Sequence, residues 1–222
     1  MSMMATIFII GFLIFIHELG HLIAARLAAI PVARFSIGFG PILWRRRWQG
    51  VEYCFSAIPL GGYVMPEIDS EESFLRIAPS RRIVMWLGGP LANFALAAVL
   101  LAAVKLAGGS ASMWGLFVEP WLDVARSAAH LLAALPAIFS KPDGLSGVIG
   151  IVAAGKSFVS GGWESTLHFA VLLNINLAVF NLLPMPPLDG GKIVCALLER
   201  VHPRLAVLHT HLAVVGLGLL LL

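Results

Sequence analysis

Two histidines and a glutamate stand close together near the start of the chain, in His17-Glu18-Leu19-Gly20-His21. On an α-helix, residues four apart lie on one face, so both imidazoles can reach the same metal ion. A glutamate between such histidines can take a proton from water, and this combination is a signature of catalytic zinc sites. The segment therefore predicts a zinc site with His17 and His21 as ligands and Glu18 as general base.

These side chains fall inside an apolar stretch, from about residue 3 to residue 30, that is long enough to cross a bilayer. An ionisable side chain at the centre of a membrane helix costs about 3 kcal/mol on insertion scales, so a function is expected for it. The alternative is that His17 and His21 form hydrogen bonds to neighbouring helices.

A catalytic zinc ion takes three protein ligands and leaves one position open. Asp189 is the candidate for the third ligand, in Asn181-Leu182-Leu183-Pro184-Met185-Pro186-Pro187-Leu188-Asp189-Gly190-Gly191. Three prolines within four positions end the preceding helix and leave its backbone groups without helical partners. Irregular backbone at a membrane boundary is tolerated only where it lies against protein or water, which indicates a functional site. The alternative is a proline-rich turn in which Asp189 caps the next helix.

The composition is that of a membrane protein. Of the 222 residues, 59% are hydrophobic and 12% charged, whereas soluble domains carry about a quarter charged residues. The same figures exclude disorder, two cysteines are too few for a disulfide scaffold, and a net charge of +3 gives no reason to expect nucleic-acid binding. Four segments are long and apolar enough to span a bilayer: 3–30, 83–107, 166–183 and 205–222. We therefore expect a polytopic α-helical membrane protein with about four transmembrane helices.

The basic residues predict the orientation of these spans. Eight of the fifteen lie from Arg26, near the end of the first span, to Arg82, just before the second, which places that loop in the cytoplasm. Both termini should then be extracytoplasmic, and the break at Pro184 to Gly191 should return to the cytoplasm, where we expect water to enter. Cys54 and Cys195 both fall on this reducing side, so a disulfide between them is not expected.

Two segments outside the spans have their own patterns. From 32 to 66, apolar and aromatic runs flank a basic turn, Arg45-Arg46-Arg47, and predict a small membrane-associated antiparallel sheet. From 114 to 139, apolar residues recur at helical spacing with charged residues between them, and Pro120 and Pro136 interrupt the pattern. An interfacial amphipathic helix is favoured there over a fifth span.

The two chemical motifs, in this order and membrane placement, resemble those of the site-2 protease family of intramembrane zinc metalloproteases. The resemblance rests on His17-Glu18-x-x-His21 and Asn181-x-x-Pro184-x-Pro186-x-Leu188-Asp189-Gly190. It extends to Gly88-Gly89-Pro90-Leu91-Ala92-Asn93 in the second span and Phe35-Ser36-Ile37-Gly38-Phe39-Gly40-Pro41 in the loop. The nearest likeness is to the bacterial branch that cleaves membrane-bound anti-sigma factors and cleaved signal peptides.

The resemblance implies regulated proteolysis within the inner or plasma membrane, on a transmembrane protein or peptide that unwinds near the site. By the same resemblance, zinc would be held by His17, His21 and Asp189, water would be activated by Glu18, and substrate backbone or oxyanion would be held by Asn93 and Asn181. The segment 32–66 would be the family's membrane-associated β-loop, whose exposed edge could pair with the unwound substrate.

One departure from the family concerns the segment 108–165, between the second and third spans. Relatives in that branch usually carry one or two PDZ domains there, and a PDZ domain of about 90 residues does not fit in about 60. We therefore expect a single domain over 1–222, with an extracytoplasmic segment at 108–165 that contains the amphipathic helix and no PDZ domain.

Two other functions are compatible with a metal site in a membrane. A metal-ion transporter would need further polar residues along a path, for which only Asn93, Asn174 and Asn176 are available. An inactive membrane scaffold is the second alternative, and the intact Glu18 argues against it because neither metal binding nor packing needs that carboxylate.

Overall fold

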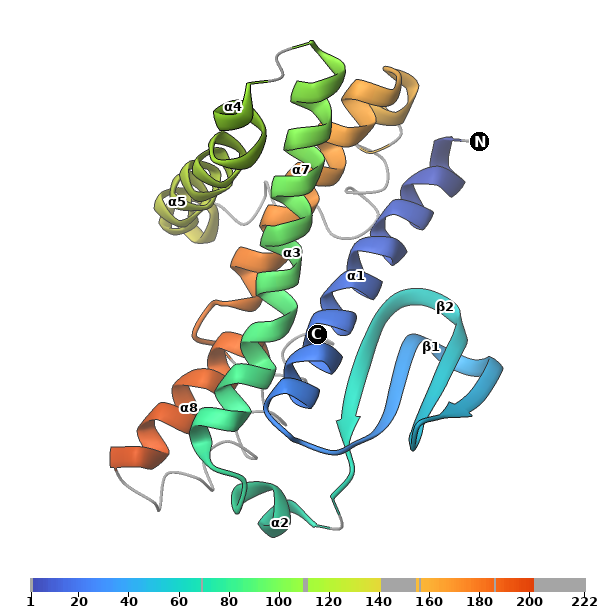
Figure 1. Cartoon of the computed structure of the whole chain (residues 1–222), viewed down its shortest axis with the longest axis vertical. Helices are drawn as coiled ribbons and strands as arrows, with labels where there is room; N and C mark the ends of the chain where they lie inside the picture. The colour runs from blue at the N-terminus through green and yellow to red at the C-terminus, as the bar shows by residue number, and fades with distance from the viewer. Residues whose placement is uncertain are drawn as a thin grey trace. The chain divides into compact units, whose positions relative to one another are not determined.

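The structure is a computed structural model that describes residues 2–68, 70–109, 112–140, 155, 157–185 and 187–201. Figure 1 shows its helices and strands, which are, in chain order, α1 (Ser2–Leu27), β1 (Val32–Trp48), β2 (Val51–Pro66), α2 (Glu71–Leu75), α3 (Pro79–Ala107), α4 (Met113–Phe117), α5 (Glu119–Ser140), α7 (Trp163–Asn181) and α8 (Asp189–Val201). The structure is mostly helical with one small sheet, as the sequence predicts.

Two of the four expected spans are helices of the required length and apolarity. They are Met4–Leu27 within α1 and Pro79–Ala107, which is α3. The third expected span, 166–183, is largely helical as α7, but α7 does not reach the same apolar level among the described residues. The fourth, 205–222, lies outside the described residues.

The chain groups into two compact units. Unit 1 comprises Met1–Leu13 and Asn93–Val179, and unit 2 comprises Ile14–Ala92 and Phe180–Leu222. His17, Glu18, His21 and Asp189 all belong to unit 2, so the geometry of the predicted site is that of a single unit.

Small residues let α1 and α3 approach closely in unit 2. Gly20 and Ala24 on α1 face Gly88 and Ala92 on α3, and a Cβ on either glycine would meet the carbonyl oxygen of the other. Small residues spaced four apart on both helices are a common means of close packing within membranes. The backbone contact fixes α3 against the turn of α1 that carries both histidines.

The end of α1 is held by α3 as well. Ala29 has a φ of 51°, in the left-handed region, and terminates the helix. The guanidinium of Arg81 on α3 donates hydrogen bonds to the carbonyl oxygens of Ala28, at 2.6 Å, and Ala29. A cation at these free carbonyls is favourable because the C-terminus of a helix carries partial negative charge.

The antiparallel sheet predicted between 32 and 66 is confirmed, with one correction. The run Arg45-Arg46-Arg47 is not the turn but part of β1, opposite residues 52–54 of β2. The turn is Gln49-Gly50, where both residues have positive φ, 48° and 82°, as a two-residue hairpin turn requires. Arginine fits readily on an exposed strand, whereas Gly50 adopts the left-handed conformation without steric cost.

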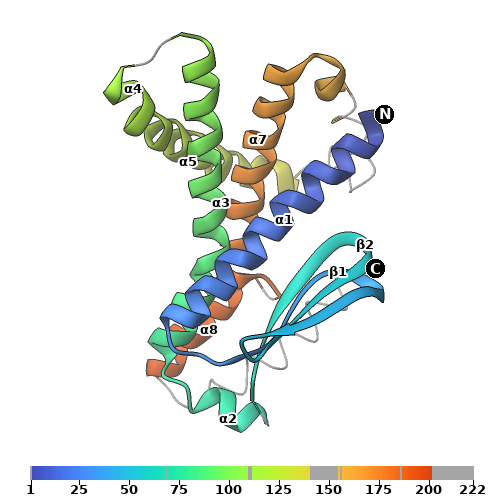
Figure 2. The same cartoon turned by 45° about the vertical axis from the view of Figure 1, so that its right-hand side comes forward.

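Both strands bend, so that one part of β1 pairs with two separate parts of β2. Phe35 is paired with Tyr53 on one side and with Val64 on the other, which places residues 32–37 between two parts of β2. Residues 62–66 therefore form one outer row. Phe35, Ile37 and Val51 on the sheet pack with Leu22 and Trp86 in the core of unit 2, and Figures 1 and 2 both draw the sheet beside the second half of α1.

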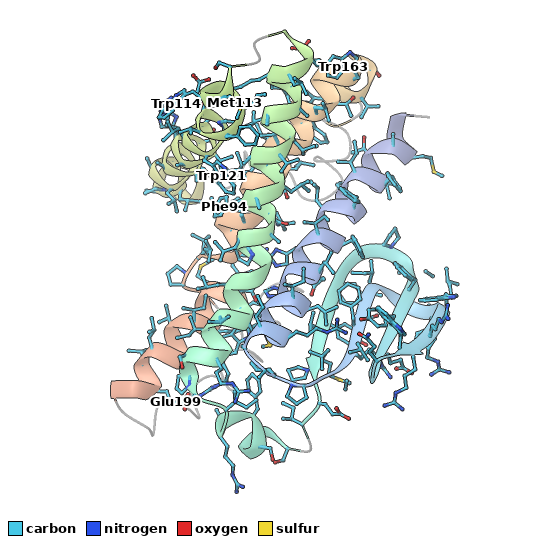
Figure 3. All side chains as sticks on the ribbon, viewed as in Figure 1. Phe94, Met113, Trp114, Trp121, Trp163 and Glu199 are labelled. Atoms are coloured by element: carbon cyan, nitrogen blue, oxygen red, sulfur yellow. The ribbon has the colours of Figure 1, made fainter. Side chains whose placement is uncertain are left out.

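Helix α8 is anchored to α3 by a buried ion pair. Arg82 is 2% exposed, and its guanidinium lies 2.6 Å from a carboxylate oxygen of Glu199, labelled on α8 in Figure 3. A second guanidinium nitrogen, Nε, donates to the carbonyl oxygen of Ile77. A buried charge needs such partners, and the pair fixes the far end of the helix that begins at Asp189.

Unit 1 contains the helix expected between 114 and 139. The segment forms two helices, α4 and α5. Neither proline interrupts α5, because Pro120 lies in its first turn and Pro136 lies within the helix. Proline is tolerated in a first turn because its missing N–H has no helical partner there. Trp114, Trp121 and Trp163, labelled in Figure 3, are all more than half exposed, as suits residues at a lipid headgroup region.

Candidate metal centre

Two imidazoles and one carboxylate converge in unit 2. His17 Nε2 lies 3.2 Å from Asp189 Oδ2, His21 Nε2 lies 3.1 Å from the same oxygen, and the two Nε2 atoms are 3.1 Å apart. All three side chains are buried. Among the described residues these are the only three histidine, cysteine or acidic side chains grouped closely enough to hold a metal ion.

The spacing of these three atoms fits zinc. Nitrogen and oxygen ligands lie about 2.0–2.2 Å from zinc, so two ligands in a tetrahedral site are roughly 3.3–3.6 Å apart. The separations found are 3.1–3.2 Å on all three sides of the triangle. The set of two histidines and one carboxylate also leaves one tetrahedral position without a protein ligand, as catalytic zinc sites do.

The other ring nitrogen of His21 fixes its tautomer. Nδ1 lies 2.8 Å from the carbonyl oxygen of Met85 on α3, and a carbonyl can only accept, so Nδ1 carries the proton. The amide nitrogen of Gly89 is also near Nδ1, but at 3.3 Å it is the weaker contact. Neutral His21 therefore has an unprotonated Nε2 directed at Asp189 and His17, and a carbonyl partner of this kind is usual behind a metal-binding histidine.

Gly89 keeps the space at the centre open. A Cβ on this residue would lie 2.7 Å from Cε1 and Nε2 of His17 and would also meet Nε2 of His21. Any larger residue would thus occupy the volume in front of both ligand nitrogens. This open volume, the distances among the three ligand atoms and the His21 tautomer all fit zinc at this position.

Asp189 is positioned by the irregular segment that precedes it. Gly190 packs so tightly that a Cβ would meet the carbonyl oxygens of Leu182 and Leu183, the two residues that follow α7. Asp189 is the first residue of α8, where negative charge is favourable. Burial alone would raise the pKa of the Asp189 carboxyl, but its close contacts with the His17 and His21 side chains and the nearby charge of Lys192 hold it well below its usual range. The side chain is therefore an anion.

Lys192 contacts the second oxygen of this carboxylate, a feature that the motifs do not indicate. Its Nζ lies 3.1 Å from Asp189 Oδ1, while Oδ2 is directed at the histidines. Lys192 follows Asp189 by three residues on α8, and residues with this spacing are neighbours on a helix. The lysine thus holds one oxygen of the carboxylate and leaves the other for the metal ion.

We predict that Lys192→Met lowers zinc affinity by about 10–100-fold, the usual cost of losing a partner that orients a metal ligand. Lys192→Arg should restore most of the affinity because it returns a cation to Asp189 Oδ1. Competition titration of the purified protein with a zinc indicator measures both. Lys105→Met, which removes a lysine paired with Glu119 in unit 1, is the matched control. Unchanged affinity in Lys192→Met would refute the orienting role.

Glu18 lies at the same cavity, between the histidines and the sheet. The cavity has a volume of about 210 Å³, and its lining includes His17, Glu18 and His21 together with residues 62–64 of β2. A Cβ on Gly62 would lie 2.7 Å from Cγ of Glu18, so this glycine makes room for the glutamate side chain. The cavity is wide enough for several water molecules beside the carboxylate.

The two asparagines predicted to contact substrate differ in their surroundings. Asn181, the last residue of α7, lines the cavity that contains Glu18 and the histidines. Asn93 is fully buried on α3, and its backbone carbonyl accepts a hydrogen bond of 2.7 Å from the side chain of Asn174, which is also fully buried. Asn174 is therefore an interhelical packing residue in unit 1, as expected from its sequence position.

The fold and the site define a class. An apolar helix carries a histidine pair with an adjacent glutamate, a carboxylate from a distant segment completes three ligands, and an open cavity lies beside them. These are the elements of a membrane-embedded, zinc-dependent hydrolase.

Sequence comparison identifies the family within this class. The sequence profile of peptidase family M50 matches residues 5–222, nearly the whole chain. The chain belongs to this family of zinc metalloproteases, which comprises the site-2 proteases. The resemblance seen in the sequence motifs is thereby confirmed.

Individual relatives agree with the family. A predicted zinc metalloprotease of Fusobacterium nucleatum is 25% identical over 90% of this chain and 89% of the relative. A predicted zinc metalloprotease of Chlamydia trachomatis is 40% identical over 45% of this chain, and the protease RseP of Yersinia pestis is 42% identical over 48%. This chain covers 19% and 26% of the length of these last two relatives.

Proposed function

We propose that this chain is an intramembrane zinc metalloendopeptidase that hydrolyses peptide bonds in the transmembrane segments of membrane-bound substrates. One observation carries the proposal: His17, His21 and Asp189 bring three ligand atoms within 3.2 Å of one another on and beside an apolar helix, with Glu18 at the same cavity. Its family membership supports the same activity.

In the proposed mechanism, His17, His21 and Asp189 would hold zinc. When bound, zinc would be a Lewis acid that polarises the scissile carbonyl and lowers the pKa of its bound water to about 7. The Glu18 carboxylate takes a proton from the attacking water and returns it to the leaving amine. The Asn181 side-chain amide, on the cavity wall, donates to the carbonyl oxygen as negative charge develops on it. Asn93 has an indirect role in this mechanism: its backbone carbonyl accepts a hydrogen bond from Asn174 and so helps to hold α3 in place.

The substrate segment must be unwound before water can attack its backbone, and the sheet offers a partner for it. Residues 62–66 form an outer row of the sheet, and Gly62, Tyr63 and Val64 line the cavity that contains Glu18. An extended substrate strand paired with this row would satisfy its backbone groups and lie beside the catalytic glutamate.

The membrane arrangement belongs to the same proposal. We propose four spans, including 166–183 and 205–222, a single domain over 1–222, a cytoplasmic β-loop at 32–66, and extracytoplasmic termini. The segment 108–165 would be extracytoplasmic and without a PDZ domain. The length of this segment, about 60 residues, supports the absence of a PDZ domain, which takes about 90. Substrates would be anti-sigma factors or signal-peptide remnants in a bacterial inner or plasma membrane.

Metal removal tests this function directly. In lipid vesicles, the purified chain should cleave a single-span substrate, and complete removal of zinc by a chelator should lower the rate by more than about 100-fold. One equivalent of zinc should restore it. Cleavage that persists in zinc-free protein would exclude the mechanism. Zinc flux across the vesicles without cleavage would instead indicate a transporter, and zinc binding without either would indicate an inactive scaffold.

A further inference from the structure

A second cavity in unit 2 lies against the other side of the catalytic helix. It has a volume of about 400 Å³ and is lined by Phe15 and Leu19 of α1 and by aromatic residues of the sheet, among them Phe35, Trp44 and Trp48. None of these residues lines the cavity that contains Glu18 and Asp189. The groove is therefore separate from the candidate metal centre.

The groove is a continuous aromatic surface. The ring centroids of Phe15 and Phe35 are 6.1 Å apart, those of Phe35 and Tyr53 are 5.8 Å apart, and those of Trp48 and Tyr53 are 6.3 Å apart. Phe35 is buried at its floor, whereas Trp44 and Trp48 are 46% and 57% exposed. Exposed aromatic surface of this extent indicates an interaction site rather than an ordinary protein surface.

The position of the groove relative to the membrane follows from α1. Phe15 and Leu19 belong to Met4–Leu27, one of the two spans long and apolar enough to cross the membrane. A groove formed partly by this helix opens into or beside the hydrocarbon region, where the available occupant is lipid or another membrane-embedded chain.

A positive charge stands at the groove. Arg46 is the one charged residue of its lining, and it is flanked in β1 by Arg45 and Arg47. Among the residues that the structure describes, Glu52 is the one carboxylate that forms an ion pair with this run: it lies 3.7 Å from Arg45 and is already paired with Arg34 at 2.6 Å. Within the described part of the chain, no carboxylate forms an ion pair with Arg46. A guanidinium in this position suits a phosphate group, which it can bind through two hydrogen bonds.

We propose that this groove binds an anionic phospholipid, with the lipid phosphate on Arg46 and an acyl chain on the aromatic floor. An acyl chain matches the groove because it brings no polar groups. An extended peptide would have to bury its backbone N–H and C=O groups against aromatic rings, which is costly. Arg46 shares its strand face with Trp44 and Trp48, and this cation favours an anionic headgroup over a zwitterionic one. This proposal depends on the membrane placement of α1 and not on the proposed peptidase activity.

Native mass spectrometry of the full chain, released from membranes containing equal amounts of phosphatidylglycerol and phosphatidylcholine, tests headgroup binding. The wild type should retain one phosphatidylglycerol in preference to phosphatidylcholine, and Arg46→Gln should lower this preference about fivefold, the effect of one cation near an anionic lipid surface. The matched control is Arg76→Gln, which removes an exposed arginine outside the groove. Circular dichroism and zinc content establish that each variant is folded.

Tryptophan fluorescence tests the position of the acyl chain. Phosphatidylglycerol with brominated acyl chains should quench Trp44 and Trp48, and a Trp44→Phe, Trp48→Phe variant should lose that share of the quenching. Equal retention of both lipids, or full retention by folded Arg46→Gln, would overturn the proposal. So would displacement of the lipid by inorganic phosphate alone, or by a transmembrane peptide that occupies the groove in its place.

Discussion

Glu18→Gln should abolish peptide-bond cleavage while zinc stays bound. Glutamine has nearly the same shape as glutamate and preserves the packing against Gly62, but its amide cannot take a proton from water. Loss of a general base lowers rates by about 10²–10⁴-fold. Single-turnover cleavage of a membrane-reconstituted substrate, measured with zinc content on the same preparation, gives both quantities.

The control for this variant is Glu67→Gln, the same change at an exposed glutamate that follows β2. It should cleave at the wild-type rate. Wild-type cleavage by Glu18→Gln would eliminate Glu18 as the base, whereas loss of zinc from this variant would show that Glu18 supports the metal site instead.

Asp189→Asn should have the largest effect on zinc affinity. The change removes the negative charge that both histidine nitrogens approach within 3.2 Å, and it also removes the ion pair with Lys192. Because loss of an orienting partner alone costs about 10–100-fold, we expect loss of the ligand charge to cost more than about 100-fold in affinity. Zinc competition titration measures the affinity, and cleavage should fall in parallel at limiting zinc.

Asp123→Asn is the matched control, because Asp123 is a partly exposed aspartate of α5 paired with Lys105 in unit 1. It should retain wild-type zinc affinity. Full zinc affinity in Asp189→Asn would mean that the third ligand comes from elsewhere in the chain.

Much of the site could be predicted from local sequence. The four-residue spacing of His17 and His21 places them on one helix face, and the proline-rich break before Asp189 marks an irregular segment with an acidic residue. Both inferences need only neighbouring residues. That the aspartate meets the histidines depends on helix packing, and for this the family resemblance supplied what residue spacing alone does not.

The contacts that orient the ligands could not be predicted in this way. The carbonyl of Met85 and the open space at Gly89 act on the histidines because Gly20 and Gly88 let two helices approach closely. The sequence signal was present as glycine and alanine four apart on both helices, but it does not specify which carbonyl faces which ring. Lys192 could have been noted from its spacing to Asp189.

The position of the arginine run was also mispredicted, for a local reason. Charged residues between apolar runs suggest a turn, but the turn-forming residues are Gln49 and Gly50, which adopt positive φ. The run therefore extends β1 and places Arg46 on the aromatic groove instead of at the hairpin tip.

X-ray absorption at the zinc edge of the purified full chain tests the metal centre most directly. We predict one zinc ion per chain with two imidazole nitrogens and one carboxylate oxygen at about 2.0–2.2 Å and no sulfur ligand. His17→Ala should lose one imidazole from that shell or lose the zinc. A shell that contains sulfur from Cys54 or Cys195, or a zinc-free protein that still cleaves its substrate, would contradict the assignment of His17, His21 and Asp189 as a catalytic zinc site.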